Sequence, residues 1–349
     1  MQFLVTGGTG YIGSHTVIEL INEGHSVVIL DSLVNSSIDS ISRIEKITNS
    51  SFNIEFNSGK DNFFYKGDIS DKNLLRKIFQ LHTIDAVIHF AGHKSVEDSS
   101  KLPLEYYSNS LSGTIVLLEE MKKNNLKKII FSSSATVYGC PDSMPLNETF
   151  ETGKCANPYG RIKFFIEEIL KDIYESDNNW KIGILRYFNP VGAHHSGLIG
   201  EDPNGIPANL MPLITRVALG KSEKLFVFGK DYDTIDGTGV RDYVHVVDVA
   251  RGHLALLRLM LNSERNMHPK IYNIGTGTGT SVLQLINTFE RVNNLSIPFE
   301  YAERRSGDVD KSWASIDLIR SQLKWYPSFN IEDMCRDAWI WEKNNDLSS

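Results

Sequence analysis

Short apolar runs alternate with segments of helical periodicity over the first half of this 349-residue chain. A short apolar run bounded by turn residues indicates a buried strand, and apolar positions that recur every three or four residues indicate an amphipathic helix. The pattern predicts strands over 3–6, 27–31, 63–65, 86–90, 128–132 and 181–185. It predicts helices that begin near Ser14 and that cover about 38–47, 71–82, 104–124 and 157–176. This alternation is typical of an α/β fold with a doubly wound parallel (Rossmann) sheet.

The pattern changes beyond Asn189. Asn, Pro and Gly are frequent over 189–212, Gly and Asp over 229–242, and helical periodicity returns near 207–220, 247–261, 281–293 and 330–344. The sequence shows neither a flexible linker nor an internal repeat, although a polar loop lies around 48–62. We therefore predict a Rossmann domain over 1–188 and a smaller C-terminal α/β lobe over 189–349 that binds substrate. That boundary is approximate, and the chain can cross between the two parts.

A glycine-rich turn follows the first predicted strand, in the order Gly7-Gly8-Thr9-Gly10-Tyr11-Ile12-Gly13. Such a turn between a strand and a helix forms the entry of a dinucleotide-binding fold, where backbone N–H groups and the helix dipole attract a pyrophosphate. Gly7 allows the tight turn, Gly10 the approach of the pyrophosphate, and Gly13 the close packing of helix on strand. The next predicted strand ends in Asp31, which is suited to accept hydrogen bonds from the adenosine ribose and to repel a 2′-phosphate. The order of these features favours an NAD site over an ordinary strand–turn–helix unit.

Composition excludes several classes of function. The net charge of −7 and the lack of a dense Lys/Arg stripe argue against a nucleic-acid partner. No apolar stretch approaches the roughly 20 residues that span a bilayer, so we expect no membrane association. Three cysteines without metal-ligand spacing, which cannot all pair, indicate free thiols in a reducing compartment. Because the first predicted strand begins at the N-terminus, we expect no signal peptide and a cytoplasmic protein. We predict no metal, since His15 and His245 have no second ligand at metal spacing.

A candidate catalytic site lies at Tyr159 and Lys163, near the start of a predicted helix. Positions i and i+4 share a helix face, so both side chains point into one site. A lysine ammonium and a cationic nicotinamide ring would favour the phenolate and bring the tyrosine pKa from about 10 toward neutrality, as a general base requires. The cluster Ser132-Ser133-Ser134 leaves a strand at its carboxyl end, where open α/β sheets bind ligands. The alternatives are a packing pair on a surface helix and a polar turn whose hydroxyls cap backbone groups.

A second glycine run, Gly275-Thr276-Gly277-Thr278-Gly279, follows an apolar strand and precedes a helical stripe. It could be a second phosphate loop, but no acidic strand end follows it. We therefore favour a structural turn.

The motifs above resemble those of the extended short-chain dehydrogenases/reductases, and within that superfamily the chain is similar to the UDP-glucose 4-epimerase family over essentially its whole length. The co-linear segments that carry this resemblance also include Ser134-Ala135-Thr136-Val137-Tyr138-Gly139, His89-Phe90-Ala91-Gly92-His93-Lys94, Pro103-Leu104-Glu105-Tyr106-Tyr107, Leu185-Arg186-Tyr187-Phe188-Asn189-Pro190, Asn209-Leu210-Met211-Pro212, Gly239-Val240-Arg241-Asp242-Tyr243 and Arg304-Arg305-x-Gly307-Asp308. The resemblance implies an isomerase of galactose metabolism that inverts C4 of UDP-galactose and UDP-glucose through a 4-keto intermediate, with NAD as cofactor.

The resemblance also implies a role for each site residue. Catalysis would fall to Tyr159, Lys163 and Ser134. The NAD-binding residues would be Gly7, Gly10, Tyr11, Ile12, Gly13, Asp31, Asn35, Ser36, Asp68, Ile69, Phe90, Lys94, Asn109, Ser132, Tyr159 and Lys163. The UDP-sugar-binding residues of the C-terminal lobe would be Asn189, Asn209, Leu210, Phe226, Phe228, Arg241, Arg305, Asp308 and Ser312, joined by Ser134 and Tyr159.

Several of these residues have a plainer alternative. Arg241 and Arg305 are suited to bidentate phosphate pairing, but Arg241 could pair with Asp242 or Asp236, and Arg305 with Glu303. Phe226 and Phe228 alternate with apolar neighbours, so one face could stack uracil or could belong to the core. For Asn189, a capping role is the plainer alternative.

Departures from the family pattern are few. They are His93 in place of an apolar residue, Arg161 before Lys163, and a long loop over 46–62. A nucleotide-sugar 4,6-dehydratase is the nearest rival, but related dehydratases carry an Asp-Glu pair where this chain has Ala135-Thr136. The sequence argues less strongly against an enzyme that acts on UDP-glucuronate. A non-catalytic NAD-binding protein is disfavoured, because it would not need Tyr159 and Lys163.

Two further expectations follow from the resemblance. Some relatives carry a tyrosine four residues after the Gly-Asp pair, where this chain has the smaller Ser312, so UDP-N-acetylhexosamines should also fit. Alternatively, Ser312 is an exposed turn residue and Trp313 blocks the pocket. The resemblance also implies a homodimer through helices near 104–124 and 157–176, although periodicity cannot tell a dimer face from a core face.

Overall fold

The computed structural model describes residues 1–54, 61–141, 143–205, 207–263, 267–305 and 308–347. The chain divides into two compact units. The first unit contains Met1–Gly139, Glu151–Arg186 and Ala250–Tyr272, and the second contains Cys140–Phe150, Tyr187–Val249 and Asn273–Ser349. The chain therefore crosses between the units five times before it stays in the second, after Gly139, Phe150, Arg186, Val249 and Tyr272.

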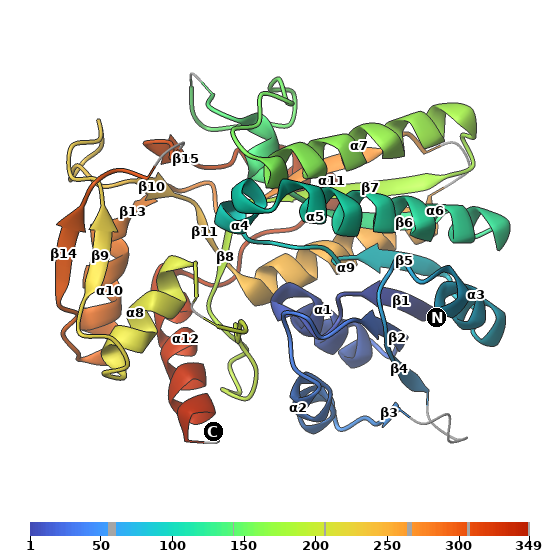
Figure 1. The fold of residues 1–349 in the computed structure, drawn as a ribbon, viewed down its shortest axis with the longest axis horizontal. Coiled ribbons are helices and arrows are strands. Elements are labelled where there is room, and N and C mark those ends of the chain that lie inside the picture. Colours follow the sequence, from blue (N-terminus) through green and yellow to red (C-terminus); the bar gives the residue numbers. More distant parts are fainter. Residues whose placement is uncertain (55–60, 142, 206, 264–266, 306–307, 348–349) are drawn as a thin grey trace. The chain divides into compact units, whose positions relative to one another are not determined.

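An eight-stranded sheet in the order β12-β7-β6-β5-β1-β2-β4-β3 forms the centre of the first unit. Its strands are β1 (Gln2–Thr6), β2 (Ser26–Asp31), β3 (Phe52–Asn53), β4 (Asn62–Lys66), β5 (Ala86–His89), β6 (Lys128–Ser134), β7 (Lys181–Tyr187) and β12 (Lys270–Ile274). The labels from β7 to β3 run down the picture in this order (Figure 1). The pairs from β6 across to β3 are parallel, so their carboxyl ends meet at one edge. All six predicted strands are present.

The helices of this unit are α1 (Tyr11–Asn22), α2 (Asp39–Thr48), α3 (Lys72–Leu81), α4 (Val96–Lys101), α5 (Pro103–Tyr106), α6 (Gly113–Lys123), α7 (Pro158–Ser176) and α9 (Val246–Asn262). Two predictions need correction. The first helix begins at Tyr11 and not near Ser14, because the glycine turn already directs the chain into it. The predicted helix over 104–124 is interrupted by a π-helical turn over Tyr107–Ser112, so α5 and α6 are separate. Residues 55–60 of the predicted polar loop lie outside the described residues.

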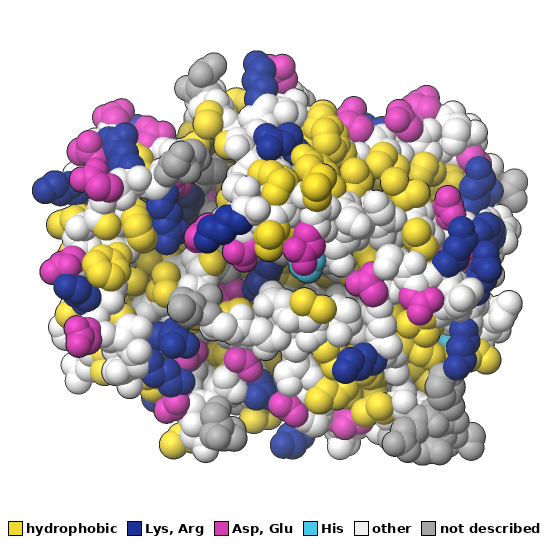
Figure 2. All heavy atoms as spheres, in the orientation of Figure 1, with side chains coloured by type: hydrophobic (Ala, Val, Ile, Leu, Met, Phe, Trp, Pro, Cys, Tyr) yellow, Lys and Arg dark blue, Asp and Glu magenta, His cyan; other side chains and the backbone are white. Residues whose placement is uncertain are grey.

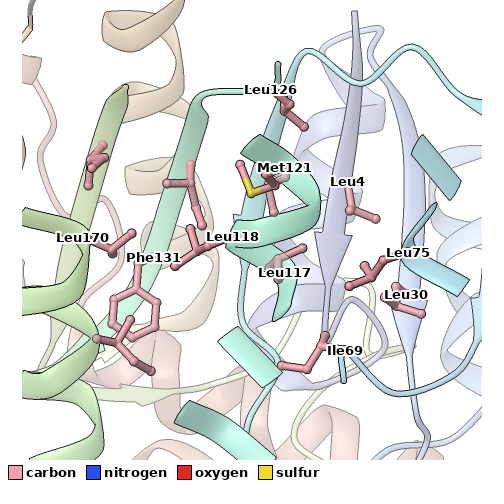
Figure 3. Close-up of a cluster of buried hydrophobic side chains, with 14 of the residues drawn as sticks. Leu4, Leu30, Ile69, Leu75, Leu117, Leu118, Met121, Leu126, Phe131 and Leu170 are labelled. Carbon is pink, nitrogen blue, oxygen red and sulfur yellow. The ribbon is translucent and has the colours of Figure 1, made fainter. Parts of the chain in front are cut away.

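One face of the sheet packs against α3, α6 and α7. Apolar side chains alternate along each strand, so that Leu4 of β1 and Phe131 of β6 join this core. Figure 3 shows Leu117, Leu118 and Met121 of α6 among these sheet residues. All five are at most 4% exposed. Burying such large apolar side chains stabilises the fold by about 1.5–3 kcal/mol each, so α6 and α7 are held firmly against the strands that precede them.

The helices α1 and α9 lie side by side in the first unit. Arg251 and Arg258 of α9 form ion pairs with Glu19 and Glu23 at the end of α1. A Cβ added at Gly183 of β7 would lie 2.6 Å from Leu256, so α9 packs directly on that strand. The sheet therefore carries helices on both faces, as a doubly wound fold requires.

The second unit has a smaller core of its own. Its elements are β8 (Asn189–Val191), α8 (Leu210–Ala218), β9 (Leu225–Phe228), β10 (Val240–Arg241), β11 (Tyr243–His245), β13 (Thr280–Ser281), α10 (Val282–Asn293), β14 (Phe299–Ala302), β15 (Lys311–Ser312), α11 (Asp317–Leu323) and α12 (Ile331–Asp346). The core comes from α8, α10, α12, β9 and β11. Short two- and three-stranded sheets, β9 with β14, β8 with β11, and β13-β10-β15, complete the unit.

These findings confirm the predicted fold class, a parallel Rossmann-type α/β sheet accompanied by a smaller α/β unit. Within the described ranges, no helix combines the length and the apolar character that crossing a membrane requires.

Candidate active site

The glycine turn at the carboxyl end of β1 has the shape that a dinucleotide needs. Gly7 has φ +71°, a conformation that L side chains rarely adopt. A Cβ at Gly13 would lie 2.2 Å from the Gly7 carbonyl oxygen, so only glycine allows α1 to begin so close to the strand. At Gly10 the same oxygen would be 3.3 Å away, and no side chain caps the N-terminus of α1. The first N–H groups of this 12-residue helix are therefore not capped by a side chain, and uncapped N–H groups of this kind can bind an anion.

Asp31 lies at the carboxyl end of β2, beside this turn. Its carboxylate accepts hydrogen bonds from Thr9 N at 3.0 Å, Leu33 N at 2.9 Å and Ser36 Oγ at 3.2 Å. An ionised carboxylate has about four acceptor positions, so it can also accept a bond from a ribose hydroxyl. Asn35 is exposed on the same loop. The structure thus brings together Asp31, Ser36 and the glycine turn.

The residues expected near adenine lie at the end of β4. Asp68 accepts hydrogen bonds from Ser70 N at 2.8 Å and from Asn109 Nδ2 at 3.2 Å, so two of the predicted residues contact each other. Ile69 is 4% exposed and its side chain belongs to the core, where it would touch a Cβ at Gly113. A contact of Ile69 with a ligand would therefore come from its backbone.

The other predicted NAD residues differ in their exposure. Tyr11 and Ile12 are half-buried in the first turn of α1, and Lys94 is exposed. The Phe90 ring lies 4.8 Å from that of His253. Ser132 is 7% exposed, and its carbonyl oxygen accepts a hydrogen bond from Lys163.

Ser134 stands at the carboxyl end of β6 and caps the short 3₁₀ helix Ala135–Tyr138 (η2). Its hydroxyl oxygen accepts hydrogen bonds from Thr136 N at 3.2 Å and from Thr136 Oγ1 at 3.0 Å. Because these two bonds occupy both lone pairs of the hydroxyl oxygen, the hydroxyl hydrogen points away from Thr136. The Tyr159 phenol lies close enough to Ser134 for this hydroxyl to lower the pKa of the phenol. The two predicted side chains therefore meet.

Tyr159 and Lys163 lie one turn apart on α7, as the spacing predicted. The helix begins at Pro158 after the cap Asn157, whose side chain accepts a hydrogen bond from Gly160 N at 2.9 Å. The Lys163 ammonium lies 5.7 Å from the centre of the Tyr159 ring and donates to Ser132 O at 2.6 Å. That bond leaves the ammonium two further donors.

Burial changes the acidity of both groups. Burial raises the pKa of Tyr159, by more than the Ser134 hydrogen bond lowers it. Burial also lowers the pKa of Lys163 to about 8, against the opposing charge of Glu167. The expected fall of the Tyr159 pKa toward neutrality is thus not produced by the protein groups around the ring, so a cationic ligand has to contribute to it.

In the second unit, Arg241 of β10 is held in one orientation. It forms an ion pair with Asp308, and its guanidinium also donates to Val240 O at 2.8 Å and Val309 O at 2.7 Å. Its ion-pair partner is therefore Asp308, another predicted site residue, and not Asp242 or Asp236. Its Nη1 also donates to Asp310 O at 3.5 Å, so that of the five N–H groups of the guanidinium the Nε–H is left for a ligand.

Arg305 and two phenylalanines form a neighbouring group. The Arg305 guanidinium lies 4.1 Å from the centre of the Phe228 ring, and among the described residues Arg305 has no ion pair with Glu303. Leu225 and Val227 of β9 are buried in the core, whereas Phe226 is 49% exposed and Phe228 half-buried on the other face. The core alternative for Phe226 is therefore wrong. Gly307 of this motif lies outside the described residues.

The remaining predicted residues surround the short strands. Ser312 of β15 pairs with Arg241 in parallel register, so their side chains share a face of that sheet. Ser312 is half-buried in a strand, which rules out the exposed-turn alternative. Asn189 is exposed on β8, and Leu210 packs against the core. Asn209 precedes α8 without capping it and donates to Glu201 at 2.7 Å.

The second glycine run forms a turn around a protein carboxylate. Thr276 N and Gly277 N donate to Asp242 at 2.7 and 3.0 Å, and Thr276 Oγ1 donates at 2.6 Å. A Cβ at Gly275 would lie 2.4 Å from that carboxylate. Because Asp242 occupies these donors, the run serves as a structural turn.

Sequence reasoning missed two charged residues behind the catalytic helix. Glu167 and Arg186 are 0% and 2% exposed and form a bidentate ion pair. The sequence contained part of the information needed to predict Glu167, since this residue follows Lys163 by four positions and so lies on the same helix face. Nothing in the sequence placed Arg186 opposite it.

Comparisons with known proteins agree with this geometry. Residues 3–275 match the NAD dependent epimerase/dehydratase family. The chain is 50% identical over 345 residues to the UDP-glucose 4-epimerase of Bacillus subtilis (strain 168), covering 99% of this chain and 98% of that protein. It is 48% identical over 350 residues to the UDP-glucose 4-epimerase of Homo sapiens, covering 99% and 97%. The crystal structure of UDP-glucose 4-epimerase from Bifidobacterium longum in complex with NAD+ and UDP superposes with a TM-score of 0.93 at 46% identity, and covers 100% of both chains.

Proposed function

Because the chain belongs to the NAD-dependent epimerase/dehydratase family, and within it to the UDP-glucose 4-epimerases, we propose that it interconverts UDP-galactose and UDP-glucose by inverting C4 of the hexose. It is an isomerase of galactose metabolism. The observation that carries the proposal is the proximity of Ser134 to Tyr159, one helical turn from Lys163, in the same unit as a glycine turn shaped for a dinucleotide. This combination supports oxidation and reduction of a hydroxyl-bearing carbon.

The cofactor is NAD, which when bound supplies the acceptor and the donor of a hydride. The N-terminus of α1 and the turn at Gly7, Gly10 and Gly13 would bind the pyrophosphate. The carboxylate of Asp31 would bind the adenosine ribose and disfavour a 2′-phosphate. The remaining contacts would come from Tyr11, Ile12, Asn35, Ser36, Asp68, Ile69, Phe90, Lys94, Asn109, Ser132, Tyr159 and Lys163.

Tyr159 would act as the general base on the sugar. Its phenolate takes the proton of the 4-hydroxyl, either directly or through the Ser134 hydroxyl that bonds it, while C4 is oxidised to a ketone. When the ketone is reduced on its other face, the same phenol returns the proton to the 4-oxygen. Lys163 would favour the phenolate by its positive charge, and its two remaining N–H donors would hold the nicotinamide ribose. Each proton and hydride removed is returned, so the reaction needs no second substrate.

Residues of the second unit would hold the UDP half of the substrate. Arg241 and Arg305 are placed to pair with the phosphates, and the exposed face of Phe226 and Phe228 to stack on uracil. Asn189, Asn209, Leu210 and Asp308 would supply further contacts. Because the binding energy is concentrated on UDP, the 4-keto sugar is free to rotate and present its other face, which inversion of C4 requires.

The rival dehydration reaction has no support in the geometry. Expelling water after oxidation needs an acid and a base beside the ketone. The corresponding positions are Ala135 and Thr136, and the Thr136 hydroxyl is already bonded to Ser134. A reaction on UDP-glucuronate would give a different product, which product analysis separates.

The small side chain of Ser312, on the same sheet face as Arg241, supports a wider substrate range. An acetamido group at C2 of the hexose would have room there. We therefore include UDP-N-acetylglucosamine and UDP-N-acetylgalactosamine among the substrates.

The protein is further proposed to be a cytoplasmic homodimer. Leu104, Ile115 and Phe165 are 84%, 41% and 40% exposed on α5, α6 and α7, and Figure 2 shows hydrophobic side chains gathered over α5 and α7. Such a contiguous apolar patch is typical of a protein–protein interface. Cys140, Cys155 and Cys335 are free thiols, which fits a reducing compartment. Light scattering tests the dimer: the expected mass is twice 39.3 kDa.

The experiment that tests the main proposal is incubation of the purified protein with UDP-galactose without added NAD. We expect UDP-glucose to form until both sugars reach equilibrium, with no net change in NADH absorbance. Absence of UDP-glucose, also after addition of NAD, would contradict the proposal. Formation of a 4-keto-6-deoxy sugar would favour dehydration instead.

A further inference from the structure

A buried ion pair lies one helical turn beyond Lys163, and the proposed mechanism does not use it. Glu167 of α7 and Arg186 of β7 are almost completely buried. Arg186 Nε and Nη2 donate to the two carboxylate oxygens of Glu167 at 3.0 and 2.6 Å. Removing two charges from water is costly, and apolar side chains of similar volume often stabilise a fold equally well. Stability alone therefore does not account for a charged pair at this place.

The pair is bound to the turn that carries Ser134 on both sides of that residue. The Ser133 hydroxyl donates to Glu167 Oε1. Arg186 Nη1 donates to the Tyr138 hydroxyl at 3.0 Å, and its guanidinium lies 4.9 Å from the centre of the Tyr138 ring. Because Ser133 and Tyr138 flank the turn, the pair connects Ser134 to α7 and β7. A displacement of the pair would move Ser134 relative to Tyr159.

Glu167 also acts on the charge of Lys163. Burial lowers the pKa of Lys163, and the Glu167 carboxylate raises it in opposition. His89 of β5 also faces Lys163, but burial lowers its pKa to about 3, so it stays neutral at neutral pH. Tyr159 lies on the same helix, and because burial raises its pKa it carries no negative charge at neutral pH. Glu167 is thus the anion that favours the protonated ammonium, and Arg186 holds the Glu167 carboxylate in place by two hydrogen bonds.

We propose that Glu167 and Arg186 are positioning residues of the reaction: they hold the Ser134 turn against α7 and keep the Lys163 ammonium charged beside Tyr159. The proposal rests on the proposed function, since Ser134, Tyr159 and Lys163 are its catalytic residues. Its consequence is that loss of the pair slows the chemical step and shifts its pH dependence, while the UDP contacts of the second unit are unaffected.

The test compares four variants with the wild type. Glu167→Gln leaves the Arg186 cation buried without its partner, and Glu167→Gln/Arg186→Met removes both charges, which buried pairs often tolerate. Ser133→Ala removes a single hydroxyl that bonds Glu167. The matched control is Glu168→Gln, because Glu168 is the next residue of α7 but forms only a half-exposed pair with Lys171. For each protein, thermal unfolding, kcat and KM for UDP-galactose, and the pH profile of kcat are measured.

We expect Glu168→Gln to match the wild type in every measurement. The double variant should fold, lose at least tenfold in kcat, keep KM within about threefold, and show its alkaline fall in kcat at a lower pH than the wild type. Ser133→Ala should lower kcat several-fold at unchanged KM. A double variant that folds and keeps the kcat and pH profile of the wild type would overturn the proposal. If the variants of the pair do not fold, an unchanged kcat in Ser133→Ala overturns it.

A spectroscopic titration separates this proposal from the proposed function. Ionisation of Tyr159 is followed by tyrosinate absorbance on NAD-loaded protein, as the difference from Tyr159→Phe. Without the pair, Lys163 loses its proton earlier, so Tyr159 should ionise at higher pH in the double variant, whereas Ser133→Ala, which keeps both charges, should ionise Tyr159 as the wild type does. This readout needs no turnover, so a wild type that is inactive on UDP-hexoses refutes only the proposed function. An unshifted titration in the double variant refutes the role of the pair.

Discussion

Replacing Gly10 with Ala should weaken NAD binding without weakening the fold. Gly10 has φ −71°, which alanine adopts without strain. The added Cβ would meet only the Gly7 carbonyl oxygen, at 3.3 Å, so the neighbouring backbone needs to move by a few tenths of an ångström. Gly13→Ala is the matched comparison, because its Cβ would lie 2.2 Å from the same oxygen, far inside contact distance.

The expected magnitudes follow from these distances. A glycine-to-alanine change at a compatible φ stabilises a protein by about 0.4–1 kcal/mol through the unfolded chain, which roughly offsets the mild contact at Gly10. A methyl group under the pyrophosphate overpacks the site, which typically costs about 1–3 kcal/mol, or about 5- to 150-fold in the dissociation constant of NAD. In Gly13→Ala the protein backbone itself is overpacked, so the free energy of unfolding should fall by about 3 kcal/mol or more.

Calorimetric titration of NAD into apo-protein, together with thermal unfolding with and without NAD, measures both effects. For Gly10→Ala we expect an unfolding temperature close to that of the wild-type apo-protein and a smaller increase on saturation with NAD. For Gly13→Ala we expect a lower unfolding temperature already without NAD. If Gly10→Ala bound NAD as tightly as the wild type, the pyrophosphate would not lie over Gly10 and the assignment of this turn would be wrong.

Four other predictions concern the general base, its pH dependence, the cofactor and the hexose pocket. Tyr159→Phe should lower kcat by about 10²–10⁴-fold with unchanged folding and NAD content; turnover within tenfold of the wild type would remove Tyr159 as the base. Because burial raises the pKa of Tyr159, kcat of the wild type should rise with pH on the acid side, where the phenol is protonated, and a flat acid limb would contradict this. Asp31→Ala should narrow the preference for NAD over NADP in apo-protein, and an unchanged ratio of the two dissociation constants would mean that the ribose is bound elsewhere. Ser312→Tyr should abolish activity on UDP-N-acetylhexosamines and spare the plain hexoses; a wild type that is inactive on the acetamido sugars at millimolar concentration refutes this pocket assignment.

Local patterns of the sequence were sufficient to predict the elements that carry the proposed catalytic residues. The apolar runs located the strands of the large sheet because a buried parallel strand must be apolar on both faces. The spacing of Tyr159 and Lys163 placed both on one helix face, since 3.6 residues complete a turn. Gly7 and Gly13 could be read as backbone requirements, because the steric demand for glycine is local. Conformational demands of this kind are satisfied within a few neighbouring residues.

Longer-range features depended on the tertiary structure. The ion pair of Glu167 and Arg186 joins a helix to a strand, and a pairing between elements leaves no periodic trace in the sequence. The partner of Arg241 was likewise not predictable: Asp242 is adjacent in sequence, but alternation along a strand turns it toward Thr276, whereas Asp308 comes from a distant segment. The sequence alone predicted which residues carry the proposed chemistry and determined the local conformation of the elements that hold them. The tertiary structure decided their charge partners and the acidity of Tyr159 and Lys163, because burial and long-range contacts set both, and these exist only once the chain has folded.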